Sequence, residues 1–249
     1  ALDDMKARGV EHLSYFQVDN PHARPVDPVF LGLHASSPSS SGQFSSKMVA
    51  KSSWDEKVGV FCRSGGRTRV IEYSDLPEEL AKQTDAEGRL RFNAGSVAIH
   101  AIGVRFIEQV SGDPDFALPF HRAVKKVPHY DPERGEHVDP DKPNAVKLER
   151  FVFDAIPLAE RSIVVEADRV EEFAPVKNAT GSDSIESSKL LQTERAARWL
   201  EACGVRVPRL SDGTVDAIIE ISPLTAQDAT ELARADLPDE IKPGATVLL

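Results

Sequence analysis

The sequence predicts an α/β protein, in which helices alternate with buried strands of one sheet. Hydrophobic residues make up 41% of the 249 positions, which is enough for a sizeable core. Apolar runs of strand length alternate with helical segments along the chain, and this order is typical of an α/β sheet. One such run ends abruptly on Asp19 and Asn20. Open α/β sheets bind their ligands at the carboxyl ends of strands, so this run also points to a site.

The first quarter of the chain contains two predicted helices and one strand. The strand is apolar and ends at the Asp19–Asn20 pair, and three prolines follow it and favour a loop. The next polar, serine-rich segment has little pattern, so we expect a mobile loop. In order, we expect a helix over 1–9, a strand over 11–18, a loop or a short broken helix over 21–29, a helix over 29–34 and a mobile loop over 36–46.

The second quarter begins with a hairpin signal. Two β-branched runs, 58–63 and 68–73, flank a turn that contains Gly65 and Gly66. A helix start follows at residue 74, where Ser and Asp can cap and acids favour the first turn. Residues 90–95 are expected to be extended, and the apolar run 96–107 to be a helix. His100 in that run is interpreted as a packed core histidine.

The remaining residues predict further strands and one long helix. A capping-box spacing at Asp183 and Glu186 opens this helix, and Gly204 ends it. The tail holds two short apolar stretches and reads as a small separate lobe. In order, we expect a helix over 113–127, a loop over 128–144, strands over 146–153 and 162–167, a loop over 171–178, a helix over 183–203 and short strands at 217–221 and 245–249.

Charge and hydropathy limit the function classes. The net charge is −10 and the pI is about 5.2, which argues against a nucleic-acid binder, because such proteins need a basic face. A single small anion remains compatible, since a few lysines suffice for it. No apolar run approaches the roughly 20 residues that span a bilayer, so we expect no membrane partner. Oligomeric state is not readable from the sequence.

Cysteine and histidine usage gives no metal or disulfide framework. The two cysteines, Cys62 and Cys203, are far apart and form no C-x-x-C pair, so a reducing cytoplasm is the simplest interpretation. The seven histidines have no metal-ligand spacing, which disfavours a zinc site. Neither G-x-G-x-x-G nor a P-loop occurs in the chain.

Several stretches together resemble a known family. In chain order they are F-Q-V-D-N at 16–20, E-K-V-G-V-F at 56–61, V-I-E-Y-S-D-L at 70–76, F-N-A-G at 92–95, P-N-A-V-K-L-E-R-F-V-F-D at 143–154, E-E-F-A-P-V-K-N-A at 171–179 and E-I-S-P-L at 220–224. Each is weak alone, but the ordered set covers nearly the whole chain. It resembles the eukaryotic-type UDP-N-acetylhexosamine pyrophosphorylases of the UTP–sugar-1-phosphate uridylyltransferase family.

The resemblance implies a fold and a reaction. The implied fold is a Rossmann-like, glycosyltransferase-A-type mixed sheet, present in part, with a small C-terminal lobe. We expect residues 1–182 to be the C-terminal part of the catalytic domain and 183–249 the lobe. The implied reaction joins UTP to a sugar 1-phosphate and releases pyrophosphate, with Mg²⁺ as cofactor. The family's glycine-rich nucleotide loop lies upstream of the D-N motif and is absent here, so we expect the isolated chain to be inactive.

Three residues match charged positions of the family's site. Asp19 matches the carboxylate that holds the metal and nucleotide phosphates; from its type and place alone it could equally cap a turn. Lys177 matches the lysine on the sugar phosphate, although a lone Lys is usually solvated surface. Lys147 matches a lysine on the UTP side, and its alternative is a plain surface residue of a strand.

Four further residues match the sugar-binding positions. Glu72, with its companion Tyr73, sits where a family carboxylate holds sugar hydroxyls, and its alternative is a strand-end cap. Ser96 replaces the family's Asn after F-N-A-G, so the sugar contact must change, with Asn93 a weak substitute. N-acetylglucosamine, N-acetylgalactosamine, glucose and galactose therefore all stay open. A UDP-glucose-type pyrophosphorylase and a non-catalytic sugar-nucleotide-binding fragment are the alternative functions.

Overall fold

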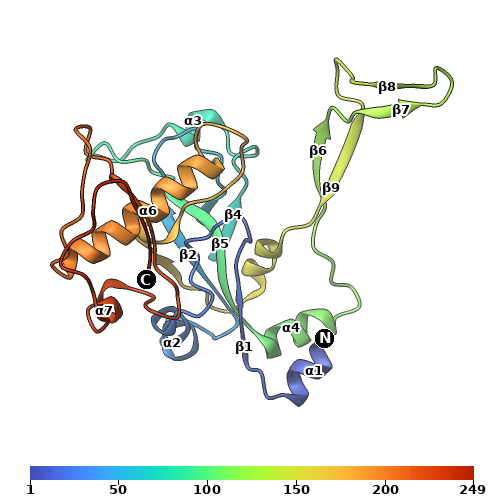
Figure 1. The fold of residues 1–249 in the computed structure, drawn as a ribbon. Coiled ribbons are helices and arrows are strands. Elements are labelled where there is room, and N and C mark those ends of the chain that lie inside the picture. The colour runs from blue at the N-terminus through green and yellow to red at the C-terminus, as the bar shows by residue number, and fades with distance from the viewer.

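The computed structural model describes residues 1–249 and is built around one six-stranded sheet (Figure 1). The sheet is mixed: β10 runs parallel to β2, and the other pairs are antiparallel. This confirms the predicted α/β class. The strand order is β10 (Val164–Glu166), β2 (Phe44–Ala50), β5 (Ala94–Gly103), β3 (Val60–Ser64) and β4 (Arg67–Ile71), with β1 (His12–Tyr15) also paired to β5.

Two apolar clusters pack helices against the sheet. One cluster joins α2 to the sheet through Phe30, Val49 and Ile99. The other joins the sheet to α4 and to the 3₁₀ helix η1 through Phe44, Phe106 and Ile156. The helices of this part are α1 (Leu2–Ala7), α2 (Pro28–Ser36), α3 (Glu78–Ala81), α4 (Val104–Ser111), η1 (Val152–Leu158) and α5 (Arg169–Glu172).

Central burial explains two wrong expectations. The run 96–107 is not a helix: β5 continues to Gly103, and only then does α4 begin. It is apolar on both faces because β5 is the central strand, so periodicity alone could not separate it from a buried helix. The expected loop over 36–46 extends too far: residues 37–43 do connect α2 to β2, but Ser45 and Ser46 are buried in β2.

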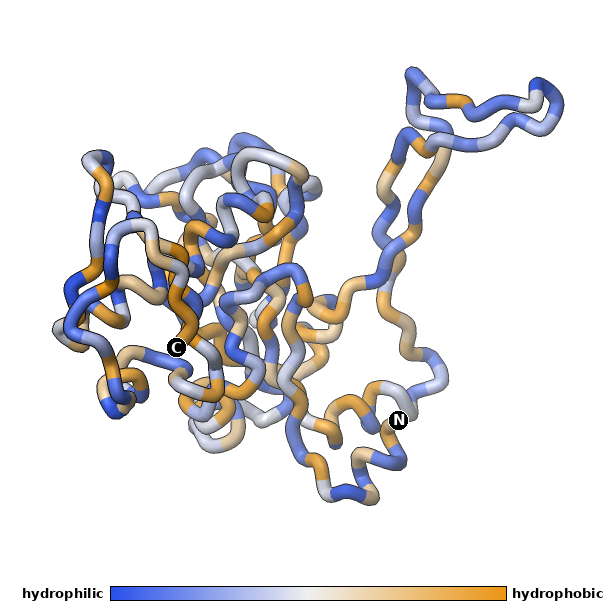
Figure 2. Tube along the Cα trace, in the orientation of Figure 1, coloured by the Kyte–Doolittle hydropathy of each residue, from blue (hydrophilic) through white to orange (hydrophobic).

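The expected helix over 113–127 does not form: residues 113–120 have no regular secondary structure, and residues 121–125 are a strand, part of a long β-ribbon. In this ribbon β6 (His121–Lys125) pairs with β9 (Ala145–Glu149), and β7 (His129–Asp131) pairs with β8 (Glu136–Val138) within the expected loop over 128–144. Figure 1 shows the ribbon projecting away from the body, and Figure 2 shows orange apolar positions along it. The expected strand over 146–153 is therefore shorter and gives way to η1.

The C-terminal residues form a layer with a core of its own, assembled around Trp199, Leu200 and Leu232. Its long helix is capped by Ser184 and Ser187 rather than by Asp183 and Glu186, because Asp183 adopts a positive φ of 53° before the cap. The elements are α6 (Ile185–Ala202), α7 (Ala229–Leu232), β11 (Ala217–Glu220) and β12 (Ala245–Leu248), the last two pairing in parallel. The boundary at residue 182 stays a prediction.

Two smaller expectations are confirmed. The hairpin forms as β3 and β4 around Gly65 and Gly66, both at positive φ. His100 is fully buried in the core, and its Nδ1 lies 2.9 Å from the Ser46 Oγ, whereas its Nε2 has no hydrogen-bond partner; burial lowers the pKa of the imidazole to about 3. None of the helices has the length and apolar character needed to cross a bilayer.

Candidate active site

The turn after β1 is bound tightly to the segment that carries Lys177. The main-chain N–H of Val176 donates to the carbonyl of Asp19 at 2.8 Å. Asn20 is buried; its Oδ1 accepts from Ala174 N at 3.0 Å and its Nδ2 donates to the Glu172 carbonyl at 2.8 Å. These three bonds join stretches that are more than 150 residues apart. They place Asp19 and Lys177 in the wall of one pocket.

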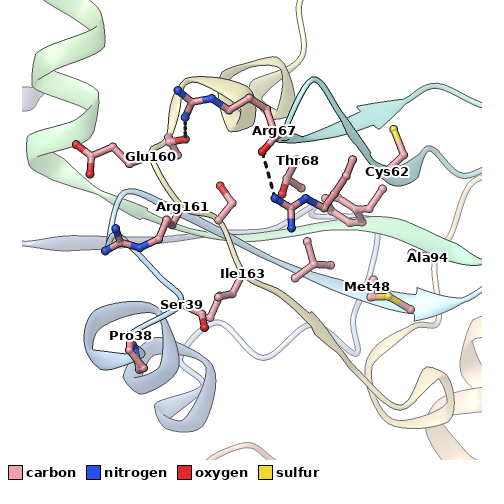
Figure 3. A pocket seen from close by; sticks show the side chains of 16 residues that line it. Pro38, Ser39, Met48, Cys62, Arg67, Thr68, Ala94, Glu160, Arg161 and Ile163 are labelled. Atoms are coloured by element: carbon pink, nitrogen blue, oxygen red, sulfur yellow. Dashed lines mark hydrogen bonds between the residues drawn. The ribbon is translucent and has the colours of Figure 1, made fainter.

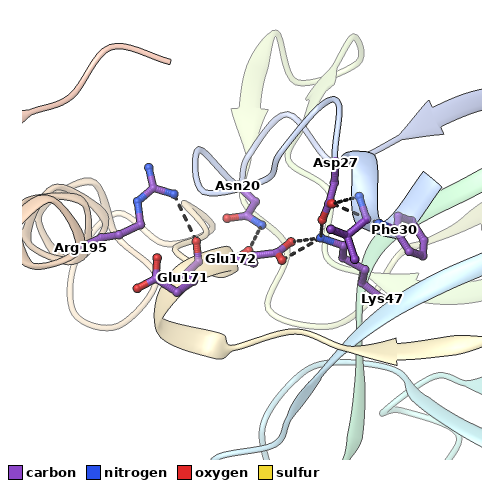
Figure 4. Close-up of polar contacts among 8 residues, drawn as sticks. Asn20, Asp27, Phe30, Lys47, Glu171, Glu172 and Arg195 are labelled. Atoms are coloured by element: carbon purple, nitrogen blue, oxygen red, sulfur yellow. Dashed lines mark hydrogen bonds and ion pairs between the residues drawn. The ribbon is translucent and has the colours of Figure 1, made fainter. Parts of the chain in front are cut away.

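A buried ion cluster lies beneath this contact (Figure 4). The Lys47 Nζ lies 2.5 Å from Asp27 Oδ2 and 2.5 Å from Glu172 Oε2, and the Lys47 side chain is only 3% exposed. Asp27 also caps α2, accepting from Val29 N at 3.0 Å. Burial alone would raise the pKa of Asp27, but the hydrogen bonds from Lys47 and the helix N–H groups hold it below its ordinary value. The cluster therefore fixes α2, β2 and α5 around Asn20.

The pocket has a volume of about 280 Å³ and gathers most of the predicted site residues. Five of them line it, and their charges are mixed. The lining residues among the predictions are Asp19, Glu72, Tyr73, Ser96 and Lys177. The side chains of Asp19 and Lys177 form no ion pair within the protein, and the Glu72 carboxylate accepts no hydrogen bond. These groups are therefore available to a ligand.

Glu72 follows β4, at the point where the hairpin reaches the pocket. A Cβ built on Gly59, which directly precedes β3, would lie 2.8 Å from Val70 Cγ1 and 3.2 Å from Glu72 Oε1, so this glycine leaves room for both side chains. Burial raises the pKa of Glu72, while the nearby charges of His121 and Lys177 partly offset the rise. The expected cap role is not seen for its side chain, because it is the Glu72 carbonyl that accepts from Asp75 N and Leu76 N.

An irregularity in β5 shapes the pocket floor. Ser96 pairs with Met48 and His100 with Ser46, so β5 carries two extra residues between these pairs. Ala98 lies within this bulge at φ 53°, a left-handed conformation that costs a non-glycine residue about 1 kcal/mol or more. Both Ser96 and Ala98 line the pocket. Such bulges re-aim side chains next to active sites.

Two predicted residues lie elsewhere. Lys147 is on β9 of the projecting ribbon, where its side chain is 59% exposed and pairs with Glu149 at 2.8 Å. It does not line the pocket. Asn93 does not line it either; its carbonyl accepts from Lys51 N at 2.8 Å at the edge of β5. The sequence predicted an extended segment around Lys147, but neither its pairing with β6 nor the path of the ribbon.

Sequence reasoning missed two further cations in the pocket wall. Lys57 and Arg150 line the pocket beside Lys177, and the Arg150 guanidinium lies 4.0 Å from the centre of the Phe120 ring. Both occur inside motifs quoted above, E-K-V-G-V-F and P-N-A-V-K-L-E-R, so their signal was present. This set of three cationic side chains and two carboxylates suits a polyanionic ligand that binds together with a metal cation.

The donor groups of the pocket decide which kind of metal site fits here. No group of three or more His, Cys, Asp or Glu side chains is arranged to hold a metal ion. Asp19 and Glu72 are the two carboxylates that line the pocket, and neither forms an ion pair. Protein-bound Mg²⁺ is commonly held by one or two carboxylates together with substrate phosphates. The residues present therefore fit an ion that arrives with a nucleotide, and not a resident metal cage.

The Glu72 pKa gives a testable pH dependence. Because the folded state raises this pKa, it binds more protons than the unfolded chain, so ionisation of Glu72 lowers the free energy of unfolding as pH rises above its ordinary range. We expect Glu72→Gln to have a higher melting temperature than the parent near pH 7, with the difference vanishing by about pH 4. Thermal unfolding at both pH values measures it, with exposed Glu87→Gln as control. A variant less stable than the parent near neutral pH would contradict the assignment.

Comparison with known proteins supports one family. Its sequence profile, described as UTP–glucose-1-phosphate uridylyltransferase, matches residues 1–200. The mouse UDP-N-acetylhexosamine pyrophosphorylase-like protein 1 is 37% identical over 239 residues, covering 90% of this chain and 46% of that protein. The Saccharomyces cerevisiae UDP-N-acetylglucosamine pyrophosphorylase is 34% identical over 225 residues, covering 88% and 45%.

Solved structures share the fold of this chain. An Entamoeba histolytica protein described as a UDP-N-acetylglucosamine pyrophosphorylase superposes with a TM-score of 0.77 at 28% identity, over 100% of this chain and 58% of that chain. The Trypanosoma brucei UDP-N-acetylglucosamine pyrophosphorylase, solved with an inhibitor, shares the fold with a TM-score of 0.72 at 24% identity, over 94% and 46%. The chain spans less than half the length of the curated relatives it matches. It belongs to the UTP–glucose-1-phosphate uridylyltransferase family.

Proposed function

We propose that this chain carries part of the active site of a uridylyltransferase that makes a UDP-sugar and pyrophosphate from UTP and a hexose 1-phosphate. The observation that carries the proposal is the shared pocket of Asp19, Glu72 and Lys177, held by the Val176–Asp19 main-chain bond. We further propose an N-acetylhexosamine 1-phosphate as the sugar substrate, because the relatives above are named for N-acetylhexosamine or N-acetylglucosamine. The free cysteines favour a cytoplasmic location.

The chemistry is an in-line displacement at the α-phosphorus of UTP. A phosphate oxygen of the sugar 1-phosphate forms the new bond to this phosphorus, and the bond to the β-phosphate breaks, with pyrophosphate taking the electron pair. Both reactants are polyanions, so positioning and charge neutralisation supply most of the rate. Lys177 neutralises the sugar phosphate, and Lys57 and Arg150 add positive charge to the same wall.

Asp19 and Glu72 have separate parts in this mechanism. Asp19 would hold Mg²⁺, which supplies charge stabilisation on the phosphate oxygens when bound. Glu72 accepts hydrogen bonds from sugar hydroxyls, since its carboxylate has no other partner. Ser96 presents a short hydroxyl from the bulge of β5 toward the same space. That hydroxyl contacts the sugar directly or through water.

We propose that Lys147 contacts UTP, although it lies outside the pocket described above. Its ribbon extends beyond the body, so it would reach a nucleotide held by other parts of the catalytic domain (Figure 1). The relatives are more than twice as long as their match here, and we propose that the missing share supplies the rest of the nucleotide site. We therefore expect this isolated chain to release no measurable pyrophosphate.

A substrate panel tests the proposal. The full-length natural protein that contains these residues is given UTP, Mg²⁺ and, in separate assays, the 1-phosphates of N-acetylglucosamine, N-acetylgalactosamine, glucose and galactose. We expect pyrophosphate release to be fastest with an N-acetylhexosamine 1-phosphate and to stop when Mg²⁺ is chelated. Faster release with glucose 1-phosphate would favour the UDP-glucose-type alternative. Absence of release with all four sugars would favour a non-catalytic binding protein.

A further inference from the structure

A second cavity, of about 620 Å³, lies between the β3–β4 hairpin and the stretch that follows η1 (Figure 3). It shares no lining residue with the candidate active site. Its volume falls in the range of roughly 300–1,000 Å³ that small-molecule sites occupy. Nothing in the proposed reaction uses it.

Three arginines line this cavity, and none of them is paired with a carboxylate. Arg67 Nη1 donates to the Ala159 carbonyl at 2.8 Å, and Arg63 Nη2 donates to the Gly66 carbonyl at 3.3 Å. The Arg161 side chain makes no hydrogen bond or ion pair. Glu160 is the one carboxylate in the lining, so the three guanidinium groups leave a local excess of positive charge in a chain of net charge −10. Guanidinium groups match the geometry of phosphate oxygens, so the excess favours a phosphate.

The rest of the lining adds hydroxyl and apolar contacts. The Ser162 Oγ is buried and has no hydrogen-bond partner, which is unusual for a buried polar atom. Thr68 adds a second hydroxyl near Arg67. Apolar side chains complete the wall. They are Met48 on β2, Phe61 on β3, Val164 on β10 and Ile163, which directly precedes β10. A free inorganic anion would leave this apolar surface uncovered.

We propose that this cavity binds a small organic phosphate, in which one phosphoryl group lies between Arg67 and Arg161 and an apolar ring covers Phe61 and Ile163. The size and the lining fit a ligand as large as a nucleoside monophosphate. The proposal stands apart from the uridylyltransferase reaction, because the two pockets have no residue in common.

Calorimetric titration of the 249-residue chain with adenosine 5′-monophosphate tests the site. Arg161→Gln removes one guanidinium that has no structural partner, and we expect a loss of affinity of about tenfold, the usual worth of one charged hydrogen bond. Arg67→Gln gives a second variant at the same phosphoryl position. The matched control is Arg69→Gln, which makes the same charge change on the same strand at a residue outside the cavity.

Each outcome decides the proposal. Loss of affinity in Arg161→Gln and Arg67→Gln, with none in Arg69→Gln, supports it. Equal losses in all three variants would show unspecific charge attraction and overturn it, as would absence of binding at millimolar ligand. A loss in Lys177→Ala without one in the arginine variants would place the ligand in the other pocket. Inorganic phosphate should bind more weakly than the nucleotide; equal affinity would remove the role of the apolar wall.

Discussion

Replacing Asp19 by Asn in the full-length natural protein is expected to lower kcat by about 10²–10³-fold, the usual effect of removing one electrostatic contact to the reacting phosphate. The change keeps the shape of the side chain and leaves the Asp19 carbonyl bonded to Val176 N, so the turn should keep its fold. The measurement is the rate of pyrophosphate release with saturating UTP and sugar 1-phosphate, at several Mg²⁺ concentrations.

The Mg²⁺ dependence distinguishes a metal ligand from a structural residue. If Asp19 holds the ion, the Asn variant needs more Mg²⁺ for half of its own maximal rate, whereas damage to the fold would leave that midpoint unchanged. Asp236→Ala serves as the control, because this exposed carboxylate lies in the C-terminal lobe, away from the pocket. An Asn variant with the parent's kcat and the parent's Mg²⁺ midpoint would contradict the assignment.

Replacing Lys47 by Met is expected to lower the free energy of unfolding by about 3–5 kcal/mol, because it leaves buried carboxylates without their cation. Asp27 and Glu172 both depend on this one ammonium group, which is almost fully enclosed. A loss of that size is a large fraction of the roughly 5–15 kcal/mol that stabilises a typical protein. Chemical denaturation of the 249-residue chain measures it.

An exposed lysine provides the control for this experiment. Lys82 forms an ion pair with Glu78 one helical turn away, with both side chains largely in water. The Lys82 Nζ also lies 4.3 Å from the centre of the Trp54 ring, so Lys82→Met should change the free energy of unfolding by about 1 kcal/mol or less. Equal effects in the two variants would show that the Lys47 cluster does not hold α2, β2 and α5 together. In that case the account of how Asn20 is fixed would also fail.

Local sequence patterns predicted the fold class and most strands. They did not predict whether a fully buried apolar run forms a helix or a strand. The hairpin of β3 and β4 was predicted because two glycines separate two β-branched runs, and both glycines do adopt positive φ in the turn. The run 96–107 was not readable, since a strand buried on both faces has the same composition as a buried helix. The strand at 44–50 was hidden by serines, whose hydroxyls are satisfied inside the sheet: Ser45 bonds His34 and Ser46 bonds His100.

The candidate site came from resemblance rather than from local pattern, and its assembly depends on long-range contacts. Nothing near Asp19 in the sequence reveals its bond to Val176, and nothing near Lys47 reveals two carboxylates at distant positions. The alternation around Lys147 correctly predicted a strand. That strand belongs to a ribbon that projects from the body, and the local pattern did not predict this projection. The roles of all these residues stay predictions until activity is measured.

The most direct test of the shared pocket is a crystal structure of the full-length natural protein with UDP-N-acetylglucosamine. The account predicts that Lys177 Nζ donates to a phosphate oxygen, that Glu72 accepts from a sugar hydroxyl, and that the sugar lies beside Ser96. A sugar nucleotide bound with Asp19, Glu72 and Lys177 all facing away from it would contradict the account.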